Sequence, residues 1–252
     1  MNASKSFKVL LMGSILILSL GTTVGCNSKS KESNIIPQSK YTQGYENIDA
    51  KQTEKLLEAN KGVLVVDVRS EEEYERGHLI NAINLPYDDD FKSELSEIKD
   101  YKDKTVLVYC KTGNRSEKAA VKLVDNGFKY VKNATEGIDE YDYKLVKVDN
   151  VTGKEAEKII RNDKHDKDLT ILDVRKTKDF NNGHLQNAIN IPLEDIDKRM
   201  NELRNYKNKE IIVYCNNGRK SAEVAEKLVK NGFTDVINIV EGVSEYNFKL
   251  VK

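Results

Sequence analysis

The chain repeats itself with a period of about one small domain. The two copies are most alike near their ends, where EGIDEYDYKLVK is matched by EGVSEYNFKLVK. Chemically distinctive residues recur at an offset of 106 residues early in the unit and 105 later, as in Asp67 and Asp173, His78 and His184, and Cys110 and Cys215. A unit of about 100 residues is a domain rather than a solenoid repeat. We therefore predict two domains of one fold, at residues 45–147 and 148–252.

Short apolar runs alternate with longer amphipathic stretches in each unit. The runs predict buried strands of a parallel sheet at 63–68, 82–86, 105–109 and 130–134, and again at 169–174, 188–192, 210–214 and 235–239. Between the third and fourth runs, RSEKAAVKLVDNGF has the apolar spacing of a helix, and Gly127 suits its C-terminal end. We predict an α/β fold, with each domain an open, mainly parallel sheet covered by helices on both faces.

The first 26 residues have the pattern of an export signal. Lys5 and Lys8 precede an apolar run from Val9 to Leu20 that is short for a membrane span, and Cys26 follows it. The segment TVGC resembles the bacterial lipobox, although Thr23 stands where leucine is usual. The resemblance implies a lipid on Cys26 and an extracytoplasmic protein attached to the cell membrane; ordinary cleavage without a lipid is the alternative. Residues 27–44 are polar and suit a tether.

Charge and cysteine count exclude several classes of protein. Lys plus Arg and Asp plus Glu both number 41, so no net charge favours binding to nucleic acid. Cys110 and Cys215 occupy equivalent places in separate repeats, which favours two free thiols over a disulfide. The sequence has no CxxC or HxxxH pair, so we expect neither a metal nor a cofactor.

Each cysteine opens a short loop between an apolar run and a predicted helix, as CKTGNRS and CNNGRKS. Backbone N–H groups converge at a helix N-terminus and favour a thiolate there. Gly113 and Gly218 allow the turn that makes an anion nest. The loops are therefore suited to covalent chemistry on sulfur with an anionic substrate.

Three motifs in order, found twice, suggest a family. The succession DVRSEEEYERGHLINAINLP, VLVYCKTGNRS and GFKYVKNATEG resembles a rhodanese domain, and DVRKTKDFNNGHLQNAINIP, IVYCNNGRKS and GFTDVINIVEG resemble a second one. The resemblance implies a sulfurtransferase in which Cys110 and Cys215 carry sulfur as persulfides. It implies a small anionic sulfur donor such as thiosulfate and a thiol or cyanide acceptor as partners. The substrate-binding residues are then Lys111, Thr112, Gly113, Asn114, Arg115 and Ser116, and Asn216, Asn217, Gly218, Arg219, Lys220 and Ser221.

Two alternatives and one ranking follow from the same loops. Related phosphatases place five residues between cysteine and arginine, whereas four separate Cys110 from Arg115, which disfavours a phosphatase. A non-enzymatic rhodanese-type binding or sulfur-sensing module is the competing class. Lys220 replaces the planar guanidinium of Arg115, so we expect the first site to be the stronger.

The other repeated polar residues have structural roles as their first interpretation. Asp67 with Arg69, and Asp173 with Arg175, predict ion pairs that orient the loops; a contribution to binding the anionic donor is the alternative. His78 and His184 are expected to be hydrogen-bonded scaffold residues, because persulfide chemistry needs no general base. His165 is expected in a solvated loop.

Overall fold

The computed structural model describes residues 41–42, 44–59, 62–162 and 169–252. Residues 1–26 with Cys26, most of the predicted tether and His165 lie outside the described residues. Within these ranges, no helix combines the length and apolar character needed to cross a membrane.

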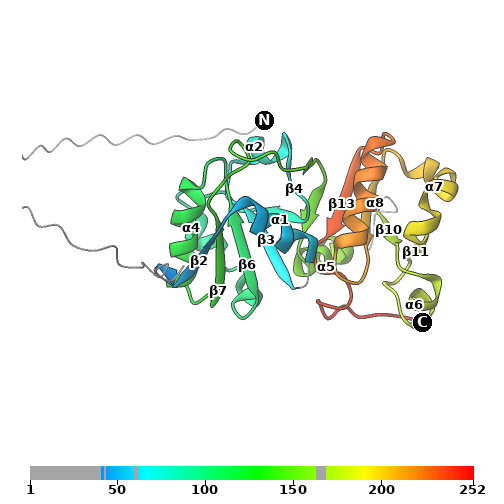
Figure 1. Ribbon diagram of the computed structural model, residues 1–252. Helices are drawn as coiled ribbons and strands as arrows, with labels where there is room; N and C mark the ends of the chain where they lie inside the picture. The colour runs from blue at the N-terminus through cyan, green and yellow to red at the C-terminus, as the bar shows by residue number, and fades with distance from the viewer. Residues whose placement is uncertain (1–40, 43, 60–61, 163–168) are drawn as a thin grey trace, which may run out of the picture. The chain divides into compact units, whose positions relative to one another are not determined.

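The first domain contains one large parallel sheet. Its strands are β1 (Tyr41–Thr42), β2 (Tyr45–Ile48), β3 (Val63–Asp67), β5 (Ala82–Asn84), β6 (Thr105–Tyr109) and β7 (Tyr130–Ala134). They lie in the order β1-β2-β7-β6-β3-β5, and only the β1–β2 pair is antiparallel (Figure 1). A separate antiparallel pair joins β4 (His78–Leu79) to β8 (Leu145–Val146). The helices are α1 (Ala50–Ala59), α2 (Glu71–Glu75), α3 (Phe91–Glu94) and α4 (Asn114–Asp125), with a short 3-10 helix η1 (Lys99–Tyr101).

Helices cover both faces of this sheet because successive strand residues point to opposite sides. Leu64 and Val66 of β3 belong to the apolar cluster that includes Leu123 of α4. Val65, which lies between them, belongs to the cluster on the other face with Leu56 of α1. The predicted α/β fold is confirmed for this domain.

The second domain repeats the arrangement. Its strands are β9 (Asp149–Val151), β10 (Thr170–Asp173), β11 (Ile189–Asn190), β12 (Glu210–Tyr214) and β13 (Asp235–Ile239), and its helices are α5 (Gly153–Asn162), α6 (Thr177–Asn182), α7 (Ile196–Arg199) and α8 (Arg219–Lys230), with 3-10 helices η3 (Leu193–Asp195) and η4 (Met200–Tyr206). All neighbours in the order β11-β10-β12-β13-β9 are parallel. Leu172 packs in the cluster that contains Leu228 of α8, and Ile171 in the cluster that contains Ile159 of α5.

The strands differ from the sequence interpretation at the start of each domain. Tyr41–Thr42, which the sequence interpretation places in the tether, pairs with β2 as the edge strand β1. Neither β2 nor β9 was predicted, although each pairs with the fourth predicted strand of its domain. These segments are short and have few apolar residues, so hydrophobic periodicity does not reveal them.

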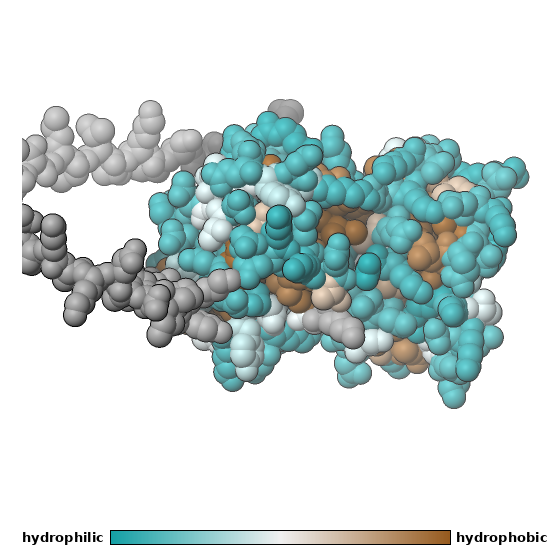
Figure 2. All heavy atoms as spheres, viewed as in Figure 1, coloured by the Kyte–Doolittle hydropathy of each residue, from teal (hydrophilic) through white to brown (hydrophobic). Residues whose placement is uncertain are grey.

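The surface of the protein is rich in hydrophilic residues, as its high content of charged residues leads us to expect. On the face drawn in Figure 2 most atoms belong to hydrophilic residues, and apolar ones show mainly in recesses between them. Charged residues make up 33% of the chain, so extensive solvated faces are expected.

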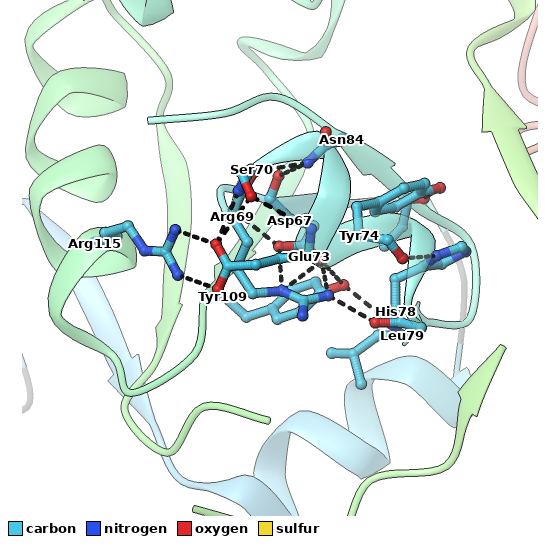
Figure 3. Close-up of polar contacts among 12 residues, drawn as sticks. Asp67, Arg69, Ser70, Glu73, Tyr74, His78, Leu79, Asn84, Tyr109 and Arg115 are labelled. Carbon is cyan, nitrogen blue, oxygen red and sulfur yellow. Dashed lines mark hydrogen bonds and ion pairs between the residues drawn. The ribbon is translucent and has the colours of Figure 1, made fainter. Parts of the chain in front are cut away.

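A buried ion pair lies at the carboxyl end of β3. Asp67 has no exposed surface and Arg69 is 3% exposed. Arg69 Nη2 donates to Asp67 Oδ2 at 2.6 Å and to the carbonyl oxygen of Gly77 at 2.8 Å (Figure 3). The Tyr109 hydroxyl donates to the same carboxylate at 2.6 Å and accepts from the Leu79 N–H at 3.0 Å. Burial, followed by the Asp67 charge, holds the pKa of Tyr109 well above its usual range.

The second domain has the same arrangement of atoms. Arg175 Nη2 donates to Asp173 Oδ2 at 2.6 Å and to the carbonyl oxygen of Gly183 at 2.7 Å. The Tyr214 hydroxyl accepts from the Leu185 N–H at 3.0 Å. The predicted ion pairs are confirmed, and each fixes the strand end that precedes the helix α2 or α6.

We predict that Asp67→Asn destabilises the protein by about 3–5 kcal/mol, because it leaves the Arg69 guanidinium buried without a counter-charge. Urea unfolding followed by circular dichroism measures the change. Asp103→Asn removes the same charge from an exposed pair with Lys129 and should leave the midpoint unchanged. A loss below about 1 kcal/mol for Asp67→Asn would contradict a structural role for the buried pair.

Candidate active site

Each loop cysteine lies between a central strand and a long helix. Cys110 directly follows β6, and α4 begins four residues later at Asn114. Cys215 stands in the same relation to β12 and α8. Both are free thiols, and both residues are 1% exposed. Ligands bind at the carboxyl ends of strands in open α/β sheets, which is where both cysteines are found.

The predicted anion nest has a backbone basis in both loops. Gly113 and Gly218 precede their helices with φ of 80° and 78°, in the left-handed region. A Cβ on either would collide with the carbonyl group of Thr135 or Val240. The first N–H groups of α4 and α8, at residues 114–116 and 219–221, have no acceptor within their own helix. They are free to bind an anion beside the thiol.

The carbonyl groups of the loops are held by the segment that follows the fourth core strand. Ile138 N–H donates to the Cys110 carbonyl oxygen at 3.2 Å, and Val243 N–H donates to that of Cys215 at 3.0 Å. Gly137 and Gly242 permit this close approach, because a Cβ on either would overlap the loop backbone. The carbonyl group of each cysteine is therefore hydrogen-bonded to the protein backbone.

Both cations of the first loop are paired with carboxylates. Arg115 Nη1 and Nη2 donate to the two oxygens of Glu73 at 2.6 and 2.8 Å, and Figure 3 shows the guanidinium facing that carboxylate. The Arg115 hydrogen bonds lower the pKa of Glu73 to about 2, although partial burial opposes the shift. Lys111 pairs with Asp139 at 3.1 Å on the surface. Glu73 also forms a capping box with Ser70 at the start of α2.

The second loop opens into a cavity of about 640 Å³. The lining residues are Arg175, Lys176, Asp179, Cys215, Asn216, Asn217, Lys220, Ser244 and Glu245. The single proton of the Ser221 hydroxyl has two acceptors within reach, the Gly218 carbonyl oxygen at 3.0 Å and Cys215 Sγ at 3.4 Å. Arg219, which was predicted to bind substrate, donates to the carbonyl oxygen of Glu58 at 3.0 Å. Within the described residues Lys220 has no ion-pair partner.

Both repeated histidines have the predicted scaffold contacts. The His78 ring stacks on Tyr74 at 3.7 Å, and its nitrogens lie 3.1 and 2.9 Å from the carbonyl oxygens of Tyr74 and Val148. Burial lowers the pKa of His78. His184 stacks on Phe180 and contacts its carbonyl oxygen at 3.0 Å through Nδ1. In the described ranges, no group of three or more His, Cys, Asp or Glu residues could hold a metal ion.

Sequence reasoning missed the acidic and basic residues that α2 and α6 bring to the loops. Glu73 pairs with Arg115 across 42 positions, and its counterpart Asp179 lines the second cavity with Lys176. Two signals were available in the sequence. Ser70-x-x-Glu73 is a capping-box pattern, and the repeat offset of 106 maps Glu73 onto Asp179.

The fold and the two sites define a class of protein: α/β domains that present a cysteine in an anion-binding loop, here in tandem. The family of Rhodanese-like domains matches the chain at residues 49–144 and again at 152–249. The chain therefore belongs to the rhodanese-like domain family and contains two such domains. The resemblance of the motifs is confirmed at this level.

Individual relatives match one domain more closely than the whole chain. A tRNA uridine(34) hydroxylase of Photorhabdus laumondii is 41% identical over 100 residues, which are 38% of this chain and 28% of the relative. A Rhodanese-like Domain Protein structure from Staphylococcus aureus is 28% identical, covers 41% of this chain and 97% of its own, and has a TM-score of 0.37. A thiosulfate sulfurtransferase structure from Pseudomonas aeruginosa is 18% identical, covers 81% of this chain and 43% of its own, and has a TM-score of 0.36. This chain covers between 28% and 62% of the length of the first curated relatives that it matches.

We predict that the Glu73 carboxyl titrates near pH 2 and that Arg115→Ala moves its midpoint back toward the ordinary value of 4.5. A depressed pKa stabilises the folded state above the ordinary value, and that contribution disappears as the pH falls from about 4.5 toward 2. Carboxyl-detected NMR titration measures both midpoints. The absence of a shift in Arg115→Ala would show that Arg115 does not cause the depression.

Proposed function

We propose that this protein is a sulfurtransferase of the thiosulfate sulfurtransferase type, which moves sulfane sulfur through persulfides on Cys110 and Cys215. One observation carries the proposal: each thiol lies at the carboxyl end of a central parallel strand, beside a helix N-terminus whose first N–H groups have no acceptor within the helix. Membership in the rhodanese-like domain family supports sulfur transfer as the type of reaction.

The first step loads sulfur onto the enzyme. The cysteine thiolate attacks the outer sulfur of thiosulfate, a new S–S bond forms, and the S–S bond of the donor breaks. Sulfite leaves with the electron pair, and the cysteine carries a persulfide anion. The charge on the terminal sulfur is stabilised by the N–H groups of residues 112–116 or 218–221 without any proton transfer.

The second step returns the thiol. A nucleophile such as cyanide attacks the terminal sulfur, the S–S bond to the cysteine breaks, and thiocyanate leaves as the thiolate is restored. At the second site the Ser221 hydroxyl lies 3.4 Å from Cys215 Sγ, within reach of the sulfur. The Ser116 hydroxyl lies 2.9 Å from the Gly113 carbonyl oxygen, which matches the 3.0 Å between the Ser221 hydroxyl and the Gly218 carbonyl oxygen.

We predict that thiosulfate adds one sulfur atom to Cys110 and one to Cys215, and that cyanide removes both as thiocyanate. Intact-protein mass spectrometry and thiocyanate release measure the two steps. Each single Cys→Ser variant should lose one of the two sulfur additions, and the double variant should lose both. Retention of sulfur by the double variant, or no uptake by the unmodified protein, would contradict the proposal and favour a binding or sensing module.

We also propose that the protein is exported and attached to the cell membrane by a lipid on Cys26. The support is the sequence alone: a basic start, an apolar run from Val9 to Leu20, and TVGC at its end. The sulfur donor and acceptor are then extracytoplasmic.

We predict that cells expressing the full chain incorporate an alkyne-labelled fatty acid into it and that Cys26→Ser abolishes the label. In cell fractionation, the Cys26→Ser variant should be lost from the membrane fraction. Cys110→Ser is the matched control, because it removes a thiol without touching the signal. Equal labelling of the Cys26→Ser variant would refute lipidation at this residue.

A further inference from the structure

The two loops differ in how their cations are partnered. In the first, Glu73 engages both terminal nitrogens of Arg115, and Asp139 engages Lys111. In the second, Asn216 replaces Lys111, and Ser244 replaces Asp139. Lys220 and Lys176 both line the second cavity, and neither has an ion-pair partner within the described residues. The backbone nests are alike, so the difference lies in the side chains at the rim.

The ion pair between Glu73 and Arg115 has a stable geometry. Its two hydrogen bonds of 2.6 and 2.8 Å join both ends of the carboxylate to the planar guanidinium, a bidentate geometry. Glu73 is held from its own side by the capping box with Ser70, so the carboxylate is already oriented toward Arg115. The corresponding Asp179 is one methylene shorter, and Lys220 offers no planar fork. An incoming dianion must therefore displace a bidentate carboxylate partner at the first site, and the described residues show no such pair for Lys220 at the second.

Acidic groups are not absent from the second cavity. Asp179 and Glu245 also line it. Glu245 accepts a hydrogen bond from the backbone N–H of Gly62 at 3.2 Å. Neither carboxylate forms an ion pair with Lys220 in the described part of the chain, which leaves that ammonium group available to a ligand.

We propose that Glu73 is a specificity-determining residue that disfavours dianionic donors at the first site, so that thiosulfate loads chiefly at Cys215. This inference rests on the proposed function, in which both cysteines accept sulfur. It reverses the ranking that the loop sequences alone suggest, because Arg115 is the better oxyanion ligand only when it is free. The first site is then the one suited to donors of lower charge.

Two sulfur donors that react by the same mechanism but differ in charge show whether the charge of the donor decides which site it loads. Methanethiosulfonate is a monoanion, and the thiolate displaces methanesulfinate from its outer sulfur just as it displaces sulfite from thiosulfate. Proteins with one loop thiol, Cys215→Ser or Cys110→Ser, report each site by itself. We expect the protein that keeps Cys215 to have the higher kcat/KM for thiosulfate relative to methanethiosulfonate.

Glu73→Gln in the Cys215→Ser background is the direct test. Glutamine keeps an oxygen for the Ser70 cap but removes the charge. We expect kcat/KM to rise about tenfold for thiosulfate, the factor that about 1.4 kcal/mol represents, and about threefold for the monoanion. The gain should shrink as salt is added. Glu72→Gln removes a charge from an exposed neighbour on the same helix and should change neither value.

Exchange of the pair in the other domain is the reciprocal test. Asp179→Glu combined with Lys220→Arg in the Cys110→Ser background should lower kcat/KM for thiosulfate more than for methanethiosulfonate. A fall in both rates for Glu73→Gln, or equal changes with both donors, would show that Glu73 only orients Arg115 and would overturn the inference. Failure of both thiols to load from either donor would overturn the proposed function as well.

Discussion

The Asp67 carboxylate is the constraint on which the first domain's site depends. It is fully buried, so its charge has to be matched, and Arg69 and Tyr109 match it from positions on two adjacent strand ends. Tyr109 is the residue before Cys110, and the backbone N–H of Val68 donates to the Tyr109 carbonyl oxygen at 3.1 Å. The group that satisfies the buried charge therefore also sets where the cysteine loop leaves the sheet. The same atoms recur around Asp173, which explains why two loops of different sequence share one backbone.

Local patterns were sufficient to predict the elements that hold the site. Continuous apolar runs such as Thr105–Tyr109 have to be buried on both faces, and only a parallel sheet between helices accommodates them. Gly113 was predicted as a turn residue before a helix, and it has the left-handed backbone that this requires. The histidines and the Asp–Arg pairs also have the structural roles that were expected. These features could be predicted because each depends on residues close together in the chain or on a simple periodicity.

Contacts between residues distant in sequence could not be predicted in the same way. Glu73 meets Arg115 because α2 and the cysteine loop follow the neighbouring parallel strands β3 and β6, whose carboxyl ends lie side by side. Arg219 is predicted from its place in the loop to bind substrate, and the sequence does not reveal that it donates to the Glu58 carbonyl oxygen, 161 positions away. Side chains at a loop rim can turn toward several partners, and the sequence does not specify which one is near. The set of loop residues was thus predictable, whereas the pairing of their charges was not.

The division between backbone and side chain bears on how a duplicated site diverges. The anion nest consists of N–H groups that every residue except proline supplies, so it tolerates the change from KTGNRS to NNGRKS provided that the glycine remains. The side chains at the rim of each loop do depend on residue type. The first domain has the bidentate pair of Arg115 with Glu73, whereas the second has Lys220 and Asp179, and the backbone nest is the same in both. In the mechanism that we propose, covalent chemistry at the sulfur depends on the nest, and selection among anions depends on the rim. Two copies of one domain can therefore keep a common reaction while they diverge in the charge of the donor that each accepts.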